Sequence, residues 1–286
     1  MKTLSELLQW GKAELAFLGS DEGDASAEVL LSEVLNLSRT SLYLEARQSV
    51  SDDHIQIYQE WVAGRKQRIP TAYLTGVAHF WNETLSVDSG CLVPRPETEA
   101  LIKAFIECSG FSQNSSFSFA DLGSGSGAIG IALLRTFPKA RGSFLDISEK
   151  ALAVTRRNLE RYGLLDRAET VRTDLFHGCS GLSWDAIISN PPYFTQQDWA
   201  EVEPEVLKEP REALDGGNDG LLFYRQIADN APKHLRAPGL VLVEVGKGQS
   251  TQVDEIFRGQ FSGGIQIFKD NLNIERAVMA RMGSNG

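Results

Sequence analysis

The stretch Phe117–Gly130 reads FSFADLGSGSGAIG and holds the clearest fold signal in the chain. Its first half is an apolar run typical of a buried strand, and its second half is a glycine-rich loop that opens a helix. A strand, glycine loop and helix in this order begin many domains in which strands and helices alternate. The stretch therefore predicts an α/β domain whose first strand ends at a ligand-binding loop.

Farther along the chain the alternation of apolar segments and helical patterns continues. The predicted strands are 117–122, 142–147, 170–174, 186–189, 240–245, 265–268 and 277–282. Continuous apolar strands separated by helices are typical of a mostly parallel, doubly wound sheet covered on both faces. The last two strands have no helical pattern between them, so we expect one strand of the seven to be antiparallel.

The first seventy residues have a different pattern, without any strand signal. Leucines from Leu4 to Leu18 keep the spacing of one helical face, and further helices are expected over 26–37 and from Ser51 onward. A bundle of this kind is either a scaffold or dimer interface, or a recognition module for a partner, and we favour recognition. The expected domains are a helical recognition domain 1–70, a hairpin or extended connector 71–99, and the α/β domain 100–286.

Composition excludes several classes of protein. The chain has 286 residues, of which 42% are hydrophobic and 23% charged, as in ordinary globular proteins. A net charge of −10 disfavours sequence-independent nucleic-acid binding, which depends on basic residues. Three cysteines far apart indicate neither a disulfide framework nor a metal site. Without a membrane-length apolar run or a signal-peptide pattern, we expect a cytoplasmic protein with no membrane contact.

The glycine loop fits two kinds of cofactor. Gly125, Gly127 and Gly130 satisfy the fingerprint of dinucleotide-binding loops, and Asp146 follows about twenty residues later, as in that fingerprint. The same glycines also suit S-adenosylmethionine, and a third interpretation is a tight strand-to-helix turn without any ligand. The loop alone does not choose among these.

Acidic residues at the ends of three predicted strands favour S-adenosylmethionine. Asp121 would repel a pyrophosphate but suits the α-ammonium group of that cofactor. Asp146 would lie beside the two hydroxyls of its ribose. Asp174 ends the third predicted strand, where an adenine would lie against Leu175 and Phe176.

The tetrad Asn190–Tyr193 reads NPPY and follows the fourth predicted strand. A residue that precedes proline is held in an extended conformation, so Asn190 and Pro191 are both restrained. Because neither proline has an N–H group, the Asn190 side-chain oxygen and the Pro191 carbonyl form a rigid pair of acceptors. Such a pair fits a planar NH₂ group, and Tyr193 offers a flat face to hold it. The tetrad therefore predicts methyl transfer to an amide or amine nitrogen.

Together, the glycine loop and this tetrad resemble class I S-adenosylmethionine-dependent methyltransferases that act on nitrogen. Two further motifs narrow the resemblance to the HemK/PrmC family, the protein-(glutamine-N5) methyltransferases of peptide chain release factors. These are Leu92–Glu99, LVPRPETE, and Glu209–Leu221, EPREALDGGNDGL. The matches run from about residue 70 to the end, and the helical region before them agrees in size and character.

The resemblance implies a class I fold, S-adenosyl-L-methionine as cofactor, and methylation of the glutamine in the Gly-Gly-Gln motif of release factors. The release factor would be the partner of the helical domain. The implied cofactor-binding residues are Gly123, Ser124, Gly125, Ser126, Gly127, Asp146, Leu175 and Asn190. The implied substrate-binding residues are Asn190, Pro191, Pro192 and Tyr193, of which Asn190, Pro191 and Tyr193 are the catalytic ones. Leu175 stands where many members have an aromatic residue, which weakens the implied adenine contact.

The main alternative is an adenine-N6 nucleic-acid methyltransferase, because the same tetrad can present acceptors to an exocyclic amine. Segment 198–219 holds eight acidic and two basic residues, an unfavourable surface for a phosphate backbone. The one basic cluster, Arg65, Lys66 and Arg68, fits a solvated helix end better than a partner contact. We therefore expect a protein substrate and no direct nucleic-acid binding.

Overall fold

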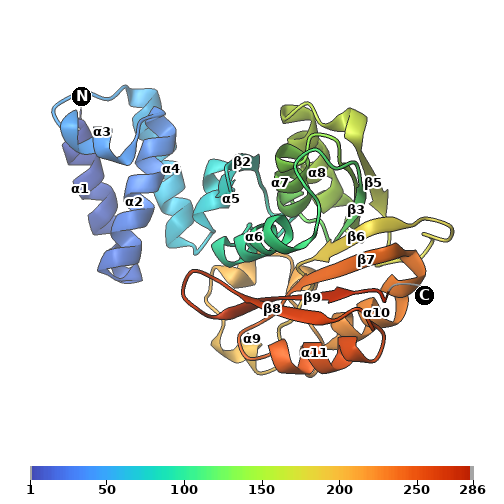
Figure 1. Ribbon diagram of the computed structural model, residues 1–286. Helices are drawn as coiled ribbons and strands as arrows, with labels where there is room; N and C mark the ends of the chain where they lie inside the picture. The colour runs from blue at the N-terminus through green and yellow to red at the C-terminus, as the bar shows by residue number, and fades with distance from the viewer. Residues whose placement is uncertain (1, 284–286) are drawn as a thin grey trace. The chain divides into compact units, whose positions relative to one another are not determined.

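The computed structural model describes residues 2–283, which form two compact units (Figure 1). The first unit contains the chain up to Val77 together with the short segment Glu203–Lys208. The second unit contains the rest of the chain. The predicted division into 1–70, 71–99 and 100–286 assigns roles as well as boundaries, and it stays a prediction. No helix within the described residues has both the length and the apolar character needed to cross a membrane.

The first unit is built from helices. They are α1 (Leu4–Leu15), α2 (Ser20–Leu35), α3 (Arg39–Leu44), α4 (Asp52–Lys66) and α5 (Thr71–Thr75). Thr3 and Glu6 form a capping box at the start of α1, and Ser51 caps α4 as its sequence predicts. Helix α2 begins at Ser20, six residues before the predicted start, because Gly19 with φ 93° turns the chain there. No range was predicted for the short helices α3 and α5, although a bundle of four or five helices was expected.

Close packing and buried ion pairs hold these helices together. Tyr58 of α4 is fully buried, and a Cβ atom on Gly11 would lie 1.8 Å from its hydroxyl oxygen, so α1 needs glycine there. Arg65 is also buried, where it donates to Glu22 and to Glu205 of the segment Glu203–Lys208. The expectation of a solvated basic cluster is therefore wrong for Arg65, whose charge is neutralised inside the unit.

A hairpin of β1 (Val77–Phe80) and β2 (Glu83–Ser86) stands at the start of the second unit, which begins at Ala78. Helix α6 (Glu99–Cys108) follows the proline-rich stretch. Asn158 anchors the hairpin to the domain, because its side chain accepts from the Ser86 N–H and donates to the Ser86 carbonyl.

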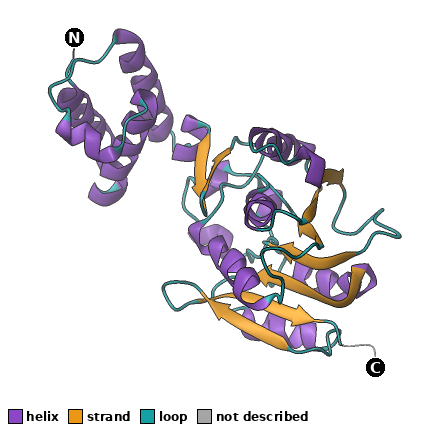
Figure 2. Ribbon diagram, turned by 45° about the horizontal axis from the view of Figure 1, so that its top comes forward, coloured by secondary structure: helices purple, strands orange, loops and turns teal. Residues whose placement is uncertain are grey.

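A seven-stranded sheet forms the centre of the second unit (Figures 1 and 2). Its strands are β3 (Ser118–Leu122), β4 (Arg141–Asp146), β5 (Ala168–Arg172), β6 (Trp184–Ser189), β7 (Leu235–Glu244), β8 (Ile265–Lys269) and β9 (Glu275–Arg281). Their order is β5-β4-β3-β6-β7-β9-β8, and only β9 runs antiparallel to its neighbours. The predicted seven strands, mostly parallel with one antiparallel, are confirmed.

Helices cover both faces of the sheet. They are α7 (Ala128–Thr136), α8 (Glu149–Arg161), α10 (Leu222–Asn230) and α11 (Ser250–Arg258), besides α6 and the single-turn α9 (Asp198–Glu201). Helix α11 was not predicted, since its sequence, STQVDEIFR, is mostly polar.

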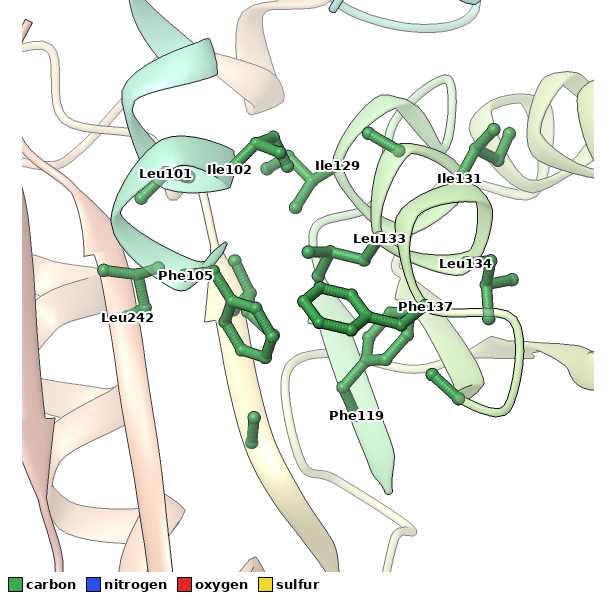
Figure 3. Packing of buried hydrophobic residues seen from close by; sticks show 14 of the residues in the cluster. Leu101, Ile102, Phe105, Phe119, Ile129, Ile131, Leu133, Leu134, Phe137 and Leu242 are labelled. Atoms are coloured by element: carbon green, nitrogen blue, oxygen red, sulfur yellow. The ribbon is translucent and has the colours of Figure 1, made fainter. Parts of the chain in front are cut away.

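Alternate residues along the strands point into two separate cores. Phe119 of β3 packs with α6 and α7, whereas its neighbour Ala120 packs with α10 and α11. Figure 3 shows Phe105 of α6 and Phe137 after α7 beside Phe119, and the rings of Phe105 and Phe137 meet edge to face at 5.7 Å. The two cores fix the sheet between its helices and so fix the positions of the strand ends.

Candidate active site

A cavity of about 330 Å³ lies at the carboxyl ends of β3, β4 and β6. This is where the order of the sheet reverses around β3, the usual ligand site of open α/β sheets. Its volume is within the range of about 300–1,000 Å³ for small-molecule pockets. The predicted site residues on its wall are Gly123, Gly125, Asp146, Leu175, Asn190, Pro191 and Pro192. Ser124, Ser126, Gly127 and Tyr193 are not among the described residues that line it.

The glycine loop presents bare backbone to the cavity. Gly123 and Gly125 have φ values of 67° and 57°, a conformation that disfavours other residues, and no neighbouring atom would contact a Cβ at either position. Gly127 has a different role, since it begins α7 with φ 82°. Ser124 and Ser126 are buried behind this surface.

Asp146 ties the glycine loop to the start of the next helix. One carboxylate oxygen accepts from the Gly125 N–H and the other from the Ser148 N–H, each at 2.9 Å. Burial raises the pKa of this carboxyl group, while the two backbone donors oppose that shift. The side chain lines the cavity and keeps further lone pairs on both oxygens, so hydroxyl donors of a ligand can still bind it.

The tetrad continues directly from the buried end of β6. Asn190, Pro191 and Pro192 all lie on the cavity wall, and the Asn190 side-chain nitrogen donates to the Thr98 hydroxyl at 3.1 Å. Tyr193 turns away into the α10 and α11 core, where its hydroxyl donates to Glu244 at 3.4 Å. The two residues that carry the predicted acceptors therefore border the cavity, whereas Tyr193 is not among the described residues of its wall.

Of the residues that were expected to contact an adenine, the structure brings only some to the cavity. Strand β5 ends at Arg172, so Asp174 follows it by two residues instead of ending it. Asp174 and Leu175 line the cavity, but Phe176 is buried and stacked on His234 with ring centroids 4.9 Å apart. Phe176 is therefore not among the described residues that line the cavity, and its contact with an adenine stays a prediction.

Comparison with known proteins places this chain in a family. The model for the PrmC N-terminal domain matches residues 6–76, and that for the methyltransferase small domain matches residues 98–244. The release factor glutamine methyltransferase of Caulobacter vibrioides is 34% identical over 97% of this chain and 96% of its own. That of Gloeobacter violaceus is 36% identical over 97% of each chain. The chain belongs to the release factor glutamine methyltransferase family.

Solved structures support the methyltransferase fold. The hMettl16 catalytic domain in complex with MAT2A 3'UTR hairpin 1 has a TM-score of 0.57 at 17% identity, covering 85% of each chain. The T. thermophilus 16S rRNA N2 G1207 methyltransferase, solved with AdoMet and guanosine, has a TM-score of 0.53 at 16% identity and covers 72% of this chain and 50% of its own. At such identities the likeness concerns the fold alone. The resemblance to the family, the class I fold and the methyltransferase domain predicted from the sequence are thus confirmed.

An ion pair joins the two motifs that first suggested the release factor glutamine methyltransferase family. Glu209 of EPREAL is buried and accepts from the Val93 N–H at 2.9 Å and from the Arg95 guanidinium. The interaction fixes the proline-rich stretch beside the segment that contributes Pro210 and Glu212 to the cavity wall. The spacing of the motifs gave no sign of this pairing, because more than a hundred residues separate them.

Other wall residues of this family member were not predicted. They are chiefly Gly90, Cys91 and Leu92 before the proline-rich stretch, and Leu222, Phe223 and Gln226 of α10. The only signal for these wall residues in the sequence was that motifs next to them resemble the family. Among the described residues, no group of three or more His, Cys, Asp or Glu side chains is arranged to hold a metal ion.

Asp121 lies next to the glycine loop but not on the cavity wall. It is fully buried, one of its oxygens accepts from the Gly130 N–H at 2.9 Å, and the other has no hydrogen-bond partner. The expected direct contact with a cofactor α-ammonium group is thus not found in this geometry. Burial instead raises the pKa of Asp121 to about 7.

This raised pKa predicts a pH-dependent stability. In the unfolded chain, the Asp carboxyl group titrates near pH 3.9. Between that pH and about 7, the native state therefore keeps a proton that the unfolded state has already lost. As a result, the contribution of Asp121 to the free energy of unfolding falls as pH rises through this window. We expect Asp121→Asn to remove this loss, since its amide stays neutral. Urea unfolding of both proteins at about pH 5 and 8 measures it. Parallel pH dependences of the two proteins would contradict the prediction.

Proposed function

We propose that this protein transfers a methyl group from S-adenosyl-L-methionine to the side-chain amide nitrogen of the glutamine in the Gly-Gly-Gln motif of peptide chain release factors. The observation that carries the proposal is the position of Asn190 and Pro191. Both border the same cavity as the glycine loop and Asp146. The relatives named release factor glutamine methyltransferases, similar over nearly their whole length, support this substrate.

The described residues fit S-adenosylmethionine. Gly123 and Gly125 offer unobstructed backbone, and Asp146 offers a carboxylate to hydroxyl donors, within a cavity that also has apolar walls at Leu175 and Phe223. Asp146 would hold the ribose, and the glycine loop would hold the part of the cofactor next to the ribose. Leu175 would contact the adenine. When bound, the cofactor supplies a methyl group on a positively charged sulfur.

The chain's own contribution is to orient a poor nucleophile. The lone pair of an amide nitrogen is delocalised, so it attacks only when held in line with the methyl carbon. The Asn190 side-chain oxygen and the Pro191 carbonyl would accept its two N–H groups, and the prolines bring no competing N–H donor. Orientation of this kind accounts for roughly 7–11 kcal/mol of barrier lowering. After the N–C bond forms, the nitrogen releases one of its protons, so no strong base is needed beforehand.

The helical region would contact the release factor rather than nucleic acid. Arg65 and Arg68, two of the three residues in its one basic cluster, are paired with Glu205, which leaves little free positive charge for phosphates. The acidic segment 198–219 would also disfavour a phosphate backbone. A protein substrate therefore suits these charges better than a polyanion does.

A competition for label tests the proposal. The protein is incubated with methyl-labelled S-adenosylmethionine, a release factor and duplex DNA in one reaction. We expect label on the release factor alone, and none when the glutamine of its Gly-Gly-Gln motif is replaced by alanine. Label on the DNA would overturn the proposal in favour of an adenine-N6 methyltransferase, and label on the altered release factor would place the target elsewhere.

A further inference from the structure

The far end of the tetrad is held by one side chain, that of Gln249. Its side-chain nitrogen donates to the Tyr193 carbonyl oxygen at 3.2 Å and to the Gly220 carbonyl oxygen at 3.5 Å. Its side-chain oxygen accepts from the Gly246 N–H at 3.0 Å. Gln249 therefore joins three segments that are distant in the sequence: the end of the tetrad, the motif that contains Gly220, and the turn between β7 and α11.

The partners of this amide settle its orientation. A backbone N–H can only donate, and a backbone carbonyl can only accept. The oxygen of Gln249 must therefore face Gly246, and the nitrogen must face the two carbonyl oxygens. The backbone of Gln249 is fixed as well, because its N–H donates to the Gly246 carbonyl oxygen and its own carbonyl accepts from the Val253 N–H of α11, each at 3.0 Å.

Two glycines let the tetrad come this close to Gln249. A Cβ atom on Gly220 would lie 2.4 Å from the Tyr193 carbonyl oxygen and 2.6 Å from the Gln249 side-chain nitrogen. A Cβ atom on Gly246 would lie 2.6 Å from the Gln249 side-chain oxygen. These distances are too short for a Cβ atom, so the hydrogen bonds of Gln249 depend on glycine at both positions.

The tetrad is stiff between its two ends. The rings of Pro191 and Pro192 fix their φ angles, and a residue before a proline has a restricted ψ angle. The start of the tetrad is fixed by β6, whose last residue, Ser189, is paired with β3 and β7 in the sheet. The other end is fixed by the hydrogen bond from Gln249 to Tyr193. A stiff segment that is held at both ends keeps Pro191 in place on the cavity wall.

We propose that Gln249 is a positioning residue that fixes the tetrad, and with it the acceptor at Pro191, for the nitrogen to be methylated. This inference rests on the proposed function, because it concerns the substrate position of the same site. Gln249 is not among the described residues that line the cavity, so it would act through the tetrad. A misplacement of about 1 Å can lower a rate about a hundredfold, so a contact outside the cavity can matter for the reaction.

Gln249→Glu tests this role with little change in shape. One glutamate oxygen can still accept from the Gly246 N–H, but the other would face two carbonyl oxygens with no proton to donate. At about pH 8, we expect this variant to lower kcat on the release factor about tenfold or more. The Kd for S-adenosylmethionine should change by less than about threefold, since the glycine loop and Asp146 lie on other segments.

Two further variants separate positioning from packing. Gln252→Glu makes the same charge change at an exposed position of α11 and should behave like the wild type. Gln249→Met keeps the length of the side chain but has no amide to donate or accept, so it should also lower kcat about tenfold. If Gln249 only fills space, Gln249→Met should be as active as the wild type. Calorimetry counts the cofactor sites, so kcat is expressed per binding-competent molecule and a loss of folded protein does not count as a loss of kcat.

The hydrogen bonds of Gln249 are also measured in the unaltered protein without substrate. Nitrogen-15 labelling of glutamine reports hydrogen exchange of the side-chain amides, and Gln249→Met and Gln252→Glu assign two of the signals. We expect the amide of Gln249 to exchange more slowly than that of the exposed Gln252, because two carbonyl oxygens engage its protons. Equal exchange rates would overturn the inference, even if the variants at position 249 failed to fold.

The outcomes separate the two proposals. If the wild type does not label the release factor, the proposed function fails, and the exchange rates still decide whether Gln249 holds the tetrad. If the wild type is active but Gln249→Glu and Gln249→Met keep its kcat, the positioning role is overturned while the proposed function stands.

Discussion

Replacing Asn190 by alanine is expected to lower methyl-transfer turnover about a hundredfold or more, while affinity for S-adenosylmethionine stays within a few-fold of the wild type. The reason is that the side-chain oxygen accepts from the substrate nitrogen, and this contact matters most as the nitrogen attacks. Asn190 lies on the cavity wall, and its nitrogen is already engaged by Thr98. Steady-state kinetics on the release factor and calorimetry with the cofactor measure the two quantities separately.

Asn114→Ala is a suitable control, because Asn114 is exposed in the connection between α6 and β3. It should behave like the wild type in both measurements. Equal losses of cofactor binding and turnover in Asn190→Ala would contradict a role as substrate acceptor. They would indicate that Asn190 mainly supports the cofactor, the other role that the family resemblance implies for it.

Replacing Asp146 by alanine is expected to weaken S-adenosylmethionine binding by about ten- to a hundredfold, the usual effect of losing hydrogen bonds to a charged group. Two losses combine in this variant. The ligand loses a carboxylate acceptor on the cavity wall, and the N–H groups of Gly125 and Ser148 lose the acceptor that fixes the glycine loop. Calorimetric titration with the cofactor measures the affinity.

Asp146→Asn separates these two contributions. Its amide oxygen can still accept from one backbone donor, so we expect an affinity between those of the wild type and Asp146→Ala. Asp166→Ala removes an exposed carboxylate in the same unit and should leave the affinity unaltered. Unchanged binding in Asp146→Ala would remove Asp146 from the cofactor site.

Local patterns predicted most of the α/β unit. The strand before Gly123, the loop itself and the helix after it were found because a buried strand, a left-handed glycine turn and an apolar helix each leave a signal within a few residues. Ser148, which caps α8 by accepting from the Ala151 N–H, is a local signal of the same kind. Helix α11 was missed because a mostly polar segment with few apolar residues resembles a loop until it packs on β9.

The candidate site was predicted less completely. The tetrad and Asp146 were found because prolines restrain their neighbours and strand ends meet at one edge of a parallel sheet. Asp121 was expected in the site but is buried against Gly130, and Phe176 was expected at the adenine but stacks on His234. The direction in which a side chain points at the end of a strand depends on the residues that pack around it, which the local sequence does not specify.

The sequence by itself determined the succession of the seven strands, the glycine loop and the rigid backbone of the tetrad, since these depend on the conformations that nearby residues allow. Only the tertiary structure decided that Glu209 pairs with Arg95, and that the side-chain amide of Asn190 donates to the Thr98 hydroxyl. These contacts join residues 92 and 114 positions apart. Their energies depend on distance, burial and hydrogen-bond direction, which exist only after the sheet has brought its strand ends together.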